Sequence, residues 1–574
     1  MSGAIDMWMY KPMDLPGRLR VFLRMACIGL AFISSTFIAI SPSVAQTVTA
    51  TDVVRLAGPV VQTAGGKVQG VLRNGALEFR GIPYGDSVSG PMRWTLPRPA
   101  PAWDGVLSAI DFRPACAQAA RYNLTEQSNS EDCLSLNISR PYPTDEPLAE
   151  QKLPVLVWIH GGAFVGGAGS LYRLDRLARD ADAVVVSLNY RLGVFGFMPH
   201  PAFDPDHNGG YALEDQRLAM RWVQDNIAAF GGDPDNITLG GESAGAASVC
   251  MHLMTPEATR GLFHKAIATS AACSFGLRSV EQAGVLGQQV AWAVGCEDPL
   301  KVLECLREKD ATELIAAGDR VAGTDLAAFA PAYGTKTLPR QGLESLQTGK
   351  VLNVPVIFGG TRDEMRLYVG YAVQAGDKIT PENYQDHLRA VYADHAPAVL
   401  ERYRLAPGQS PAAALGSVNS DFHPGAGINH CQYADTAALL SKHLPVFMME
   451  FADRNVPVLG VAMPATPDPG FELGAAHSSD LNYFFPNFSN TSRMDAPDLS
   501  SQSQALADQV VNAWGQFMRM GVPRADGLPE WLPFNVSQKV LRVHPGQNGQ
   551  IDPWKEYQCS FWRERYPAAF SARP

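Results

Sequence analysis

The sequence has little charge of either sign and no tract of biased composition. Only 18% of its 574 residues are charged, and 47 Lys and Arg against 57 Asp and Glu give a formal net charge of −10. The basic residues are not gathered into the stripe that a nucleic-acid partner requires. With 46% hydrophobic residues, the chain also lacks the composition of a disordered protein. We therefore expect a globular protein with a large core and no nucleic-acid partner.

Motifs for metals and nucleotides are missing as well. The chain has no Cys-x-x-Cys pair and no His-Glu-x-x-His sequence, which are typical of zinc sites. The glycine-rich stretch 162–170 lacks the Gly-Lys-Ser/Thr ending of a phosphate-binding loop and a complete Gly-x-Gly-x-x-Gly. We therefore expect no metal and no organic cofactor.

Long hydrophobic runs are confined to the N-terminus. Three arginines between residues 18 and 24 precede an apolar run over 25–40, and Ser43-Val44-Ala45 fits a small-residue cleavage site. The run is short for a membrane-spanning helix. We predict that residues 1–45 are an export signal and that the mature protein is periplasmic or secreted, without a stable membrane span. An uncleaved anchor helix is the alternative.

The cysteines suit an oxidising compartment. One of the nine lies in the predicted signal, which leaves eight. Cys116 with Cys133 and Cys296 with Cys305 would close short loops, as disulfides of secreted proteins often do. Spacing alone leaves the connectivity open, because eight cysteines can pair in many ways.

The hydrophobic pattern predicts an α/β fold. Asn74-Gly75 between two apolar runs predicts a tight hairpin, and helical spacing over 214–230 ends at Gly231-Gly232. Segments 275–350 and 370–440 are rich in helix formers, so we expect large helical insertions over one face of the sheet and over the active site. Short apolar runs predict the buried strands of a mostly parallel central sheet, covered by helices, at 154–159, 183–188, 237–239, 354–358 and 445–451.

A candidate nucleophile follows the run 237–239. Gly241-Glu242-Ser243-Ala244-Gly245 fits Gly-x-Ser-x-Gly, which is a weak signal by itself. Here a strand leads in and an Ala-rich helix over 244–253 leads out, which is the context of a nucleophile elbow. The serine of such an elbow lies on a strained turn that side chains at Gly241 or Gly245 would crowd. We predict Ser243 as the nucleophile; an ordinary glycine-rich turn is the alternative.

The remaining parts of a serine hydrolase site have candidates elsewhere. His160-Gly161-Gly162-Ala163 follows a strand, where such a run offers backbone N–H groups to an oxyanion. An acid and a histidine should follow the serine in the chain. Asp363-Glu364 comes after the strand at 354–358, and His477 comes after the small residues 474–476. The residues alone leave the histidine open, since others lie at 387, 395, 423, 430, 443 and 544.

Together these segments resemble the type B carboxylesterase family, which includes cholinesterases and some fungal lipases, over nearly all of the chain after residue 45. The resemblance implies an α/β-hydrolase fold in one domain over 46–574, and a small-molecule ester as substrate. The Val-Ala-Gln signal end favours a bacterial exported member. The resemblance does not indicate an oligomeric state. The segments that carry the resemblance are 79–84, 131–137, 160–164, 189–193 and 230–234 leading into 241–245.

The resemblance also implies individual roles. It makes Ser243 the nucleophile, Glu364 the acid and His477 the base. It assigns the oxyanion donors to the N–H groups of Gly162, Ala163 and Ala244, and makes Glu242 the acidic neighbour of the serine. The implied disulfides are Cys116–Cys133, Cys296–Cys305 and Cys431–Cys559, which leaves Cys250 and Cys273 as free, buried thiols.

Departures from the family pattern narrow the expected activity. No Trp lies between Cys116 and Cys133, where cholinesterases carry the ring that stacks on choline. Met365 follows the acid in place of a common Gly, and Ser478-Ser479-Asp480 follows the base. We expect a serine hydrolase that cleaves carboxylic esters through an acyl-enzyme, and not an acetylcholinesterase. The alternatives are a lipase for long acyl chains and a non-catalytic adhesion or binding member of the fold.

Overall fold

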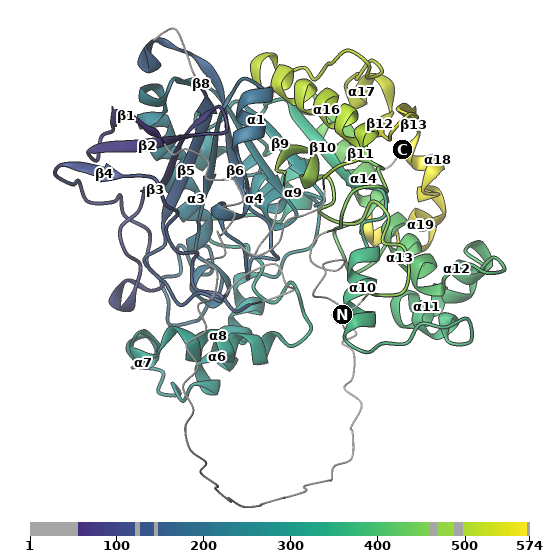
Figure 1. Ribbon diagram of the computed structural model, residues 1–574. Coiled ribbons are helices and arrows are strands. Elements are labelled where there is room, and N and C mark those ends of the chain that lie inside the picture. The colour runs from purple at the N-terminus through teal and green to yellow at the C-terminus, as the bar shows by residue number, and fades with distance from the viewer. Residues whose placement is uncertain (1–55, 121–126, 143–146, 459–467, 487–497, 571–574) are drawn as a thin grey trace, which may run out of the picture. The chain divides into compact units, whose positions relative to one another are not determined.

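A long mixed β-sheet runs through the described part of the chain (Figure 1). The computed structural model describes residues 56–120, 127–142, 147–458, 468–486 and 498–570. The predicted export signal, residues 1–45, lies outside these ranges. Within them, no helix combines the length and the apolar character needed to cross a bilayer.

The sheet is parallel at its centre and antiparallel at its ends. In the spatial order of the strands, which is given at the end of this paragraph, all neighbouring strands from β7 to β12 are parallel. The pairs from β1 to β7 and the pair β12–β13 are antiparallel. β4 (Val106–Ser108) pairs with β2 off this path. The order is β1 (Leu56–Gln62), β2 (Lys67–Arg73), β3 (Ala76–Pro83), β5 (Ser135–Pro141), β7 (Val184–Leu188), β6 (Leu153–Ile159), β8 (Gly232–Glu242), β9 (Lys265–Thr269), β10 (Val356–Thr361), β11 (Val446–Phe451), β12 (Val540–Val543) and β13 (Gly549–Ile551).

Several predicted elements are confirmed. Asn74 and Gly75, with φ of 51° and 72°, form the turn of the β2–β3 hairpin. Each of the five predicted buried runs falls on a strand, namely β6, β7, β8, β10 and β11. The predicted helix at 214–230 is α3 (Tyr211–Asn226) with a 3₁₀ turn after it, and it ends at Gly231, whose φ is 82°. β9 (Lys265–Thr269) was not predicted, because this five-residue strand has a polar residue at each end.

Alternate side chains of the central strands enter two separate cores. Leu156 and Trp158 on β6 pack with α1 (Asp175–Asp180) and α16 (Ser501–Met520) on one face. Val155 and Val157 pack with α3 and α4 (Ala244–Leu253) on the other. This period of two is what a strand with both faces buried produces. Helices therefore cover both faces, as predicted.

The expected helical insertions are present in two groups. In Figure 1, α6, α7 and α8 lie together at one end of the described fold, and α11, α12 and α13 lie together at another side. The first group comes from 275–350 and contains α6 (Val280–Ala293), α7 (Val302–Glu308), α8 (Ala311–Ala322) and α9 (Gly342–Thr348). The second contains α10 (Arg366–Gln374), α11 (Tyr384–Tyr392), α12 (Ala396–Arg402), α13 (Pro411–Asp421) and α14 (His430–Leu440).

Four disulfides connect all eight cysteines outside the predicted signal. Three of them are Cys116–Cys133, Cys296–Cys305 and Cys431–Cys559, the last joining α14 to α19 (Cys559–Arg565). The prediction that Cys250 and Cys273 are free is wrong, because they form the fourth. β8 and β9 are neighbours in the sheet, so α4, which follows β8, lies beside the segment that follows β9. The two Cα atoms are 5.1 Å apart.

The fourth disulfide should be found by peptide mapping of the protein under non-reducing conditions. We expect a cross-linked peptide pair that contains Cys250 and Cys273, with no alkylation of either after denaturation without reductant. The double variant Cys250→Ala, Cys273→Ala should lose about 2–4 kcal/mol of unfolding free energy in a denaturant titration. Alkylation of both thiols in the wild-type protein would contradict this assignment.

Candidate active site

Ser243 lies on a sharp turn between β8 and α4. Its φ of 56° and ψ of −124° are strained for a residue with a side chain. Its N–H donates to the carbonyl of Thr269 on β9 at 2.9 Å. A Cβ at Gly241 would lie 2.5 Å from the Gly245 carbonyl carbon, and one at Gly245 would lie 2.1 Å from the oxygen of Ile159. The turn therefore requires both glycines, as predicted from the sequence pattern.

Ser243, His477 and Glu364 form a hydrogen-bonded row. The Ser243 Oγ lies 2.9 Å from His477 Nε2, and His477 Nδ1 lies 2.7 Å from a carboxylate oxygen of Glu364. Ser243 and Glu364 follow the C-terminal ends of β8 and β10, and His477 lies on the segment after β11. His430 is placed differently, since it stacks on Tyr557 and its Nε2 contacts the Arg362 carbonyl.

Glu364 is fully buried and held by several donors. Its Oε1 accepts the Thr361 N–H and the Tyr433 hydroxyl, both at 2.9 Å. Burial by itself would raise the pKa of Glu364, but the facing His477, together with the hydrogen bond from the Thr361 N–H, holds the pKa below its usual value. The group is therefore an anion that fixes the orientation of the imidazole.

A second carboxylate lies on the serine side of the imidazole. Glu242 Oε1 is 3.3 Å from His477 Nε2 and accepts the Ser478 hydroxyl at 2.7 Å. Burial would lower the pKa of His477, but Glu242 and Glu364 outweigh it and raise the pKa to about 9. Burial also raises the pKa of Asp480 to about 8, with the negative charges of Glu242 and Glu364 adding to the effect.

The predicted oxyanion donors lie on a tight loop after β6 and at the start of α4. Gly162, Ala163 and Phe164 all have positive φ, at 113°, 52° and 63°. The Gly162 carbonyl accepts the N–H groups of residues 165 and 166, which closes the loop. A Cβ at Gly161 would lie 3.1 Å from the Ser243 Cβ, so the loop runs directly beside the serine. Within the described ranges, the N–H groups of Gly162, Ala163 and Ala244 have no protein acceptor.

A buried carboxylate that was not predicted from the sequence joins the segments that carry Glu364 and His477. Asp363 is buried, accepts the Ala475 N–H at 3.0 Å, and pairs with Arg454 through two contacts of 2.8 and 2.9 Å. A Cβ at Gly474 would lie 2.3 Å from the Asp363 carboxylate, which explains the small residues before His477. No local signal marks Arg454, which is distant from Asp363 in the chain. Tyr433 and Ser478 were missed for the same reason.

The described residues contain no group of three or more His, Cys, Asp or Glu side chains that could hold a metal ion. Hydrogen bonds instead join Ser243, His477 and Glu364 to one another. What the arrangement offers chemically is a hydroxyl, an imidazole with an anionic partner, and free N–H groups beside them.

The sheet order, the turn at the end of β8 and the covering helices define an α/β-hydrolase fold. The chain belongs to the carboxylesterase family, whose family model matches residues 57–562. Para-nitrobenzyl esterase of Bacillus subtilis (strain 168) is 33% identical over 498 residues, covering 84% of this chain and 94% of that protein. Phenmedipham hydrolase of Pseudarthrobacter oxydans is 32% identical, covering 86% and 96%. Acylcarnitine hydrolase of Mus musculus is 29% identical, covering 89% and 92%.

Solved structures lead to the same family. A PNB esterase structure matches with a TM-score of 0.70 and 31% identity, covering 87% of this chain and 98% of that one. A thermophilic PNB esterase matches with the same TM-score and identity and 99% coverage of its chain. The protein is therefore a carboxylic ester hydrolase, and small-molecule esters are the substrates that the family implies.

The Asp363–Arg454 pair should contribute measurably to stability. A double-mutant cycle with Asp363→Asn and Arg454→Met should give a coupling energy of about 1–2 kcal/mol, below the value for a fully buried pair. The reduction follows from the exposure of Arg454, whose side chain is 50% exposed. Denaturant unfolding of the four proteins measures it, and additive effects within error would show that the pair is not coupled.

Proposed function

We propose that the protein hydrolyses carboxylic esters in two steps through an acyl-enzyme on Ser243. The observation that supports this best is the row of two hydrogen bonds from Ser243 through His477 to Glu364. A serine hydroxyl is a weak nucleophile until an adjacent base takes its proton, and that base works best when a third group orients it.

In the first step, the Ser243 oxygen attacks the ester carbonyl carbon as His477 Nε2 takes the hydroxyl proton. The carbonyl oxygen becomes an oxyanion, which the N–H groups of Gly162, Ala163 and Ala244 stabilise. When the tetrahedral intermediate collapses, the ester C–O bond breaks and His477 gives its proton to the departing alcohol. Glu364 stabilises the imidazolium throughout and keeps Nε2 directed at the serine.

In the second step, water replaces the alcohol. His477 takes a proton from the water as its oxygen attacks the acyl carbon, the same N–H groups hold the new oxyanion, and the bond to Ser243 breaks as the proton returns to the serine oxygen. The products are a carboxylic acid and the free enzyme. No metal or organic cofactor takes part in either step.

We further propose that the enzyme acts outside the cytoplasm as one catalytic domain over 46–574. The predicted signal over 1–45 supports this, and so do the four disulfides, which persist in oxidising compartments. One relative is named a para-nitrobenzyl esterase, which favours para-nitrobenzyl esters as the first substrates to test.

Replacement of the nucleophile is the direct test. Ser243→Ala should lower kcat for p-nitrophenyl butyrate by about 10⁴-fold or more, with an unchanged melting temperature. A fluorophosphonate probe should label Ser243 in the wild type and leave the variant unlabelled. A folded variant that keeps full turnover would disprove the mechanism.

The pH dependence tests the role of Glu242. Because the base must be neutral, kcat/KM should rise with pH as His477 loses its proton, with an apparent pKa above the ordinary value of 6.5. Glu242→Gln removes a negative charge 3.3 Å from Nε2, which destabilises the imidazolium, so the apparent pKa should fall.

A profile of kcat/KM from pH 5 to 10, corrected for spontaneous hydrolysis, measures that shift. Glu78→Gln is the matched control, since it removes a buried carboxylate paired with Arg80 on β3 and should leave the profile in place. An unchanged or higher apparent pKa in Glu242→Gln would show that the second carboxylate does not act on the base.

A further inference from the structure

The loop that carries the predicted oxyanion donors is strained and needs outside support. Ala163 and Phe164 both occupy positive φ, which costs free energy for residues with side chains. Neighbouring segments support it, and two of these contacts lie in its first half: the Tyr190 hydroxyl donates to the His160 carbonyl at 2.7 Å, and the Gly193 N–H donates to the Phe164 carbonyl at 2.8 Å. Neither of them holds the end of the loop at Gly167.

Gln118 holds that end with its side-chain amide. Its Oε1 accepts the Gly167 N–H at 2.9 Å, and its Nε2 donates to the Gly167 carbonyl at 2.9 Å and to the Cys116 carbonyl at 2.9 Å. The side chain is 2% exposed. Only one orientation of the amide satisfies these partners, since the N–H must face an oxygen and both carbonyls must face a donor. The contact is therefore specific to glutamine.

Gly167 connects the Gln118 contact to the part of the loop that carries Gly162 and Ala163. A Cβ at Gly167 would lie 2.3 Å from His160 Nδ1 and 2.5 Å from the Gly161 carbonyl oxygen. The end of the loop is thus packed directly on its beginning, and Gly162 and Ala163 lie in the turn between the two. If Gly167 shifts, the N–H groups of the turn shift relative to Ser243.

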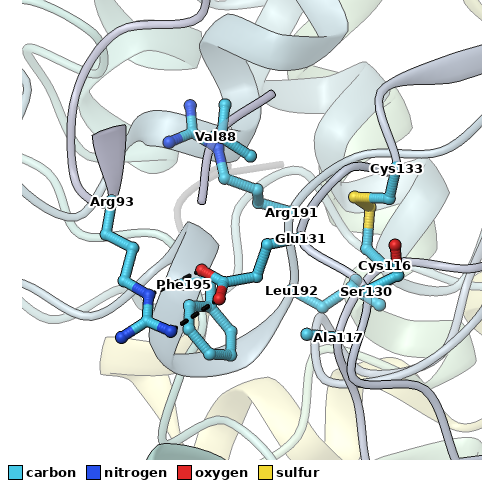
Figure 2. Close-up of a pocket in the computed structure, with 10 residues that line it drawn as sticks. All are labelled: Val88, Arg93, Cys116, Ala117, Ser130, Glu131, Cys133, Arg191, Leu192 and Phe195. Atoms are coloured by element: carbon cyan, nitrogen blue, oxygen red, sulfur yellow. Dashed lines mark hydrogen bonds and ion pairs between the residues drawn. A yellow bond between two sulfur atoms is a disulfide. The ribbon is translucent and has the colours of Figure 1, made fainter. Parts of the chain in front are cut away.

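Gln118 is itself anchored by a backbone bridge and by a nearby disulfide. Its backbone forms a two-bond bridge with Ser128, and the Cys116–Cys133 disulfide closes the loop around both. Figure 2 shows the residues that line one pocket, with this disulfide on one side and Arg93 and Glu131 on the other. The Arg93 and Glu131 side chains pair through two contacts of 2.6 and 2.7 Å.

We propose that Gln118 is a positioning residue that holds the oxyanion loop in its reactive geometry, and that the Cys116–Cys133 disulfide and the Gln118–Ser128 bridge keep Gln118 in place. The inference rests on the proposed function, because it needs Gly162 and Ala163 to act as oxyanion donors. Gln118 acts through Gly167 and does not touch the substrate. Its removal should therefore weaken binding of the oxyanion more than binding of the uncharged ester.

The test compares an oxyanion-forming ligand with one that forms none. An aryl-alkyl trifluoromethyl ketone adds to Ser243 and presents an oxyanion, whereas the corresponding secondary alcohol binds without one. For Gln118→Ala we expect kcat on p-nitrophenyl butyrate to fall about 10- to 100-fold and the ketone Ki to rise by a similar factor. KM and the alcohol Ki should stay within about threefold.

Two further variants test whether the defect of Gln118→Ala comes from the lost contact or from general damage to the fold. Gln118→Glu keeps the side-chain length and the acceptor for the Gly167 N–H but loses both N–H donors, so its defect should have the same pattern. Gln224→Ala is the matched control, since this amide also donates to two backbone carbonyls, those of Pro234 and Gly261, away from the oxyanion loop. It should leave kcat and both inhibition constants unchanged.

The outcomes separate this inference from the proposed function. If the ketone does not inhibit the wild type and fluorophosphonate does not label Ser243, the proposed function fails and the inference fails with it. If both reagents act on the wild type but a folded Gln118→Ala or Gln118→Glu matches it in kcat and ketone Ki, only the role of Gln118 is overturned. Equal weakening of ketone and alcohol in these variants would also overturn it.

Discussion

The close approach of three backbone segments around Ser243 is the constraint on which the rest of the site depends. β8 ends, α4 begins and the loop after β6 passes at distances that leave no room for a Cβ at Gly241, Gly245 or Gly161. This contact raises the serine out of the sheet edge and places the start of α4 beside the loop that carries Gly162. The strain at the turn is tolerated because the strands on either side of it are fully buried and paired.

Buried carboxyl groups are gathered around the imidazole of His477. Glu242, Glu364 and Asp480 are all buried, and the charges of Glu242 and Glu364 stabilise the protonated form of His477. The pocket therefore favours the imidazolium, the form that the proposed mechanism requires beside the oxyanion. Asp363, one residue before Glu364, pairs instead with Arg454.

Sequence patterns predicted those parts of the fold that depend on residues close together in the chain. The hairpin at Asn74-Gly75, helix α3 and the turn at Ser243 each follow from glycines or from side-chain periodicity within a few residues. The choice of His477 and Glu364 came from the family resemblance, because the residues alone left several histidines open. The Asp363–Arg454 pair, the Gln118 contact and the Cys250–Cys273 disulfide could not be predicted in this way. Each joins segments that only the finished sheet brings together, and β9, which sets the disulfide, is too short and polar to show a pattern.

The Cys431–Cys559 disulfide has a consequence for how the enzyme can be re-engineered. Cys431 and Tyr433 lie on the same helix, and the tyrosine hydroxyl holds Glu364. α19 is thus covalently attached to α14, the helix whose Tyr433 contacts Glu364. Truncations, C-terminal fusions and circular permutants that disturb residues 559–565 would act on the centre of the enzyme, although they alter only its end. Sites for tags and insertions are better chosen near the N-terminal hairpins, because their strands are far in the sheet order from β10 and β11, which α14 contacts.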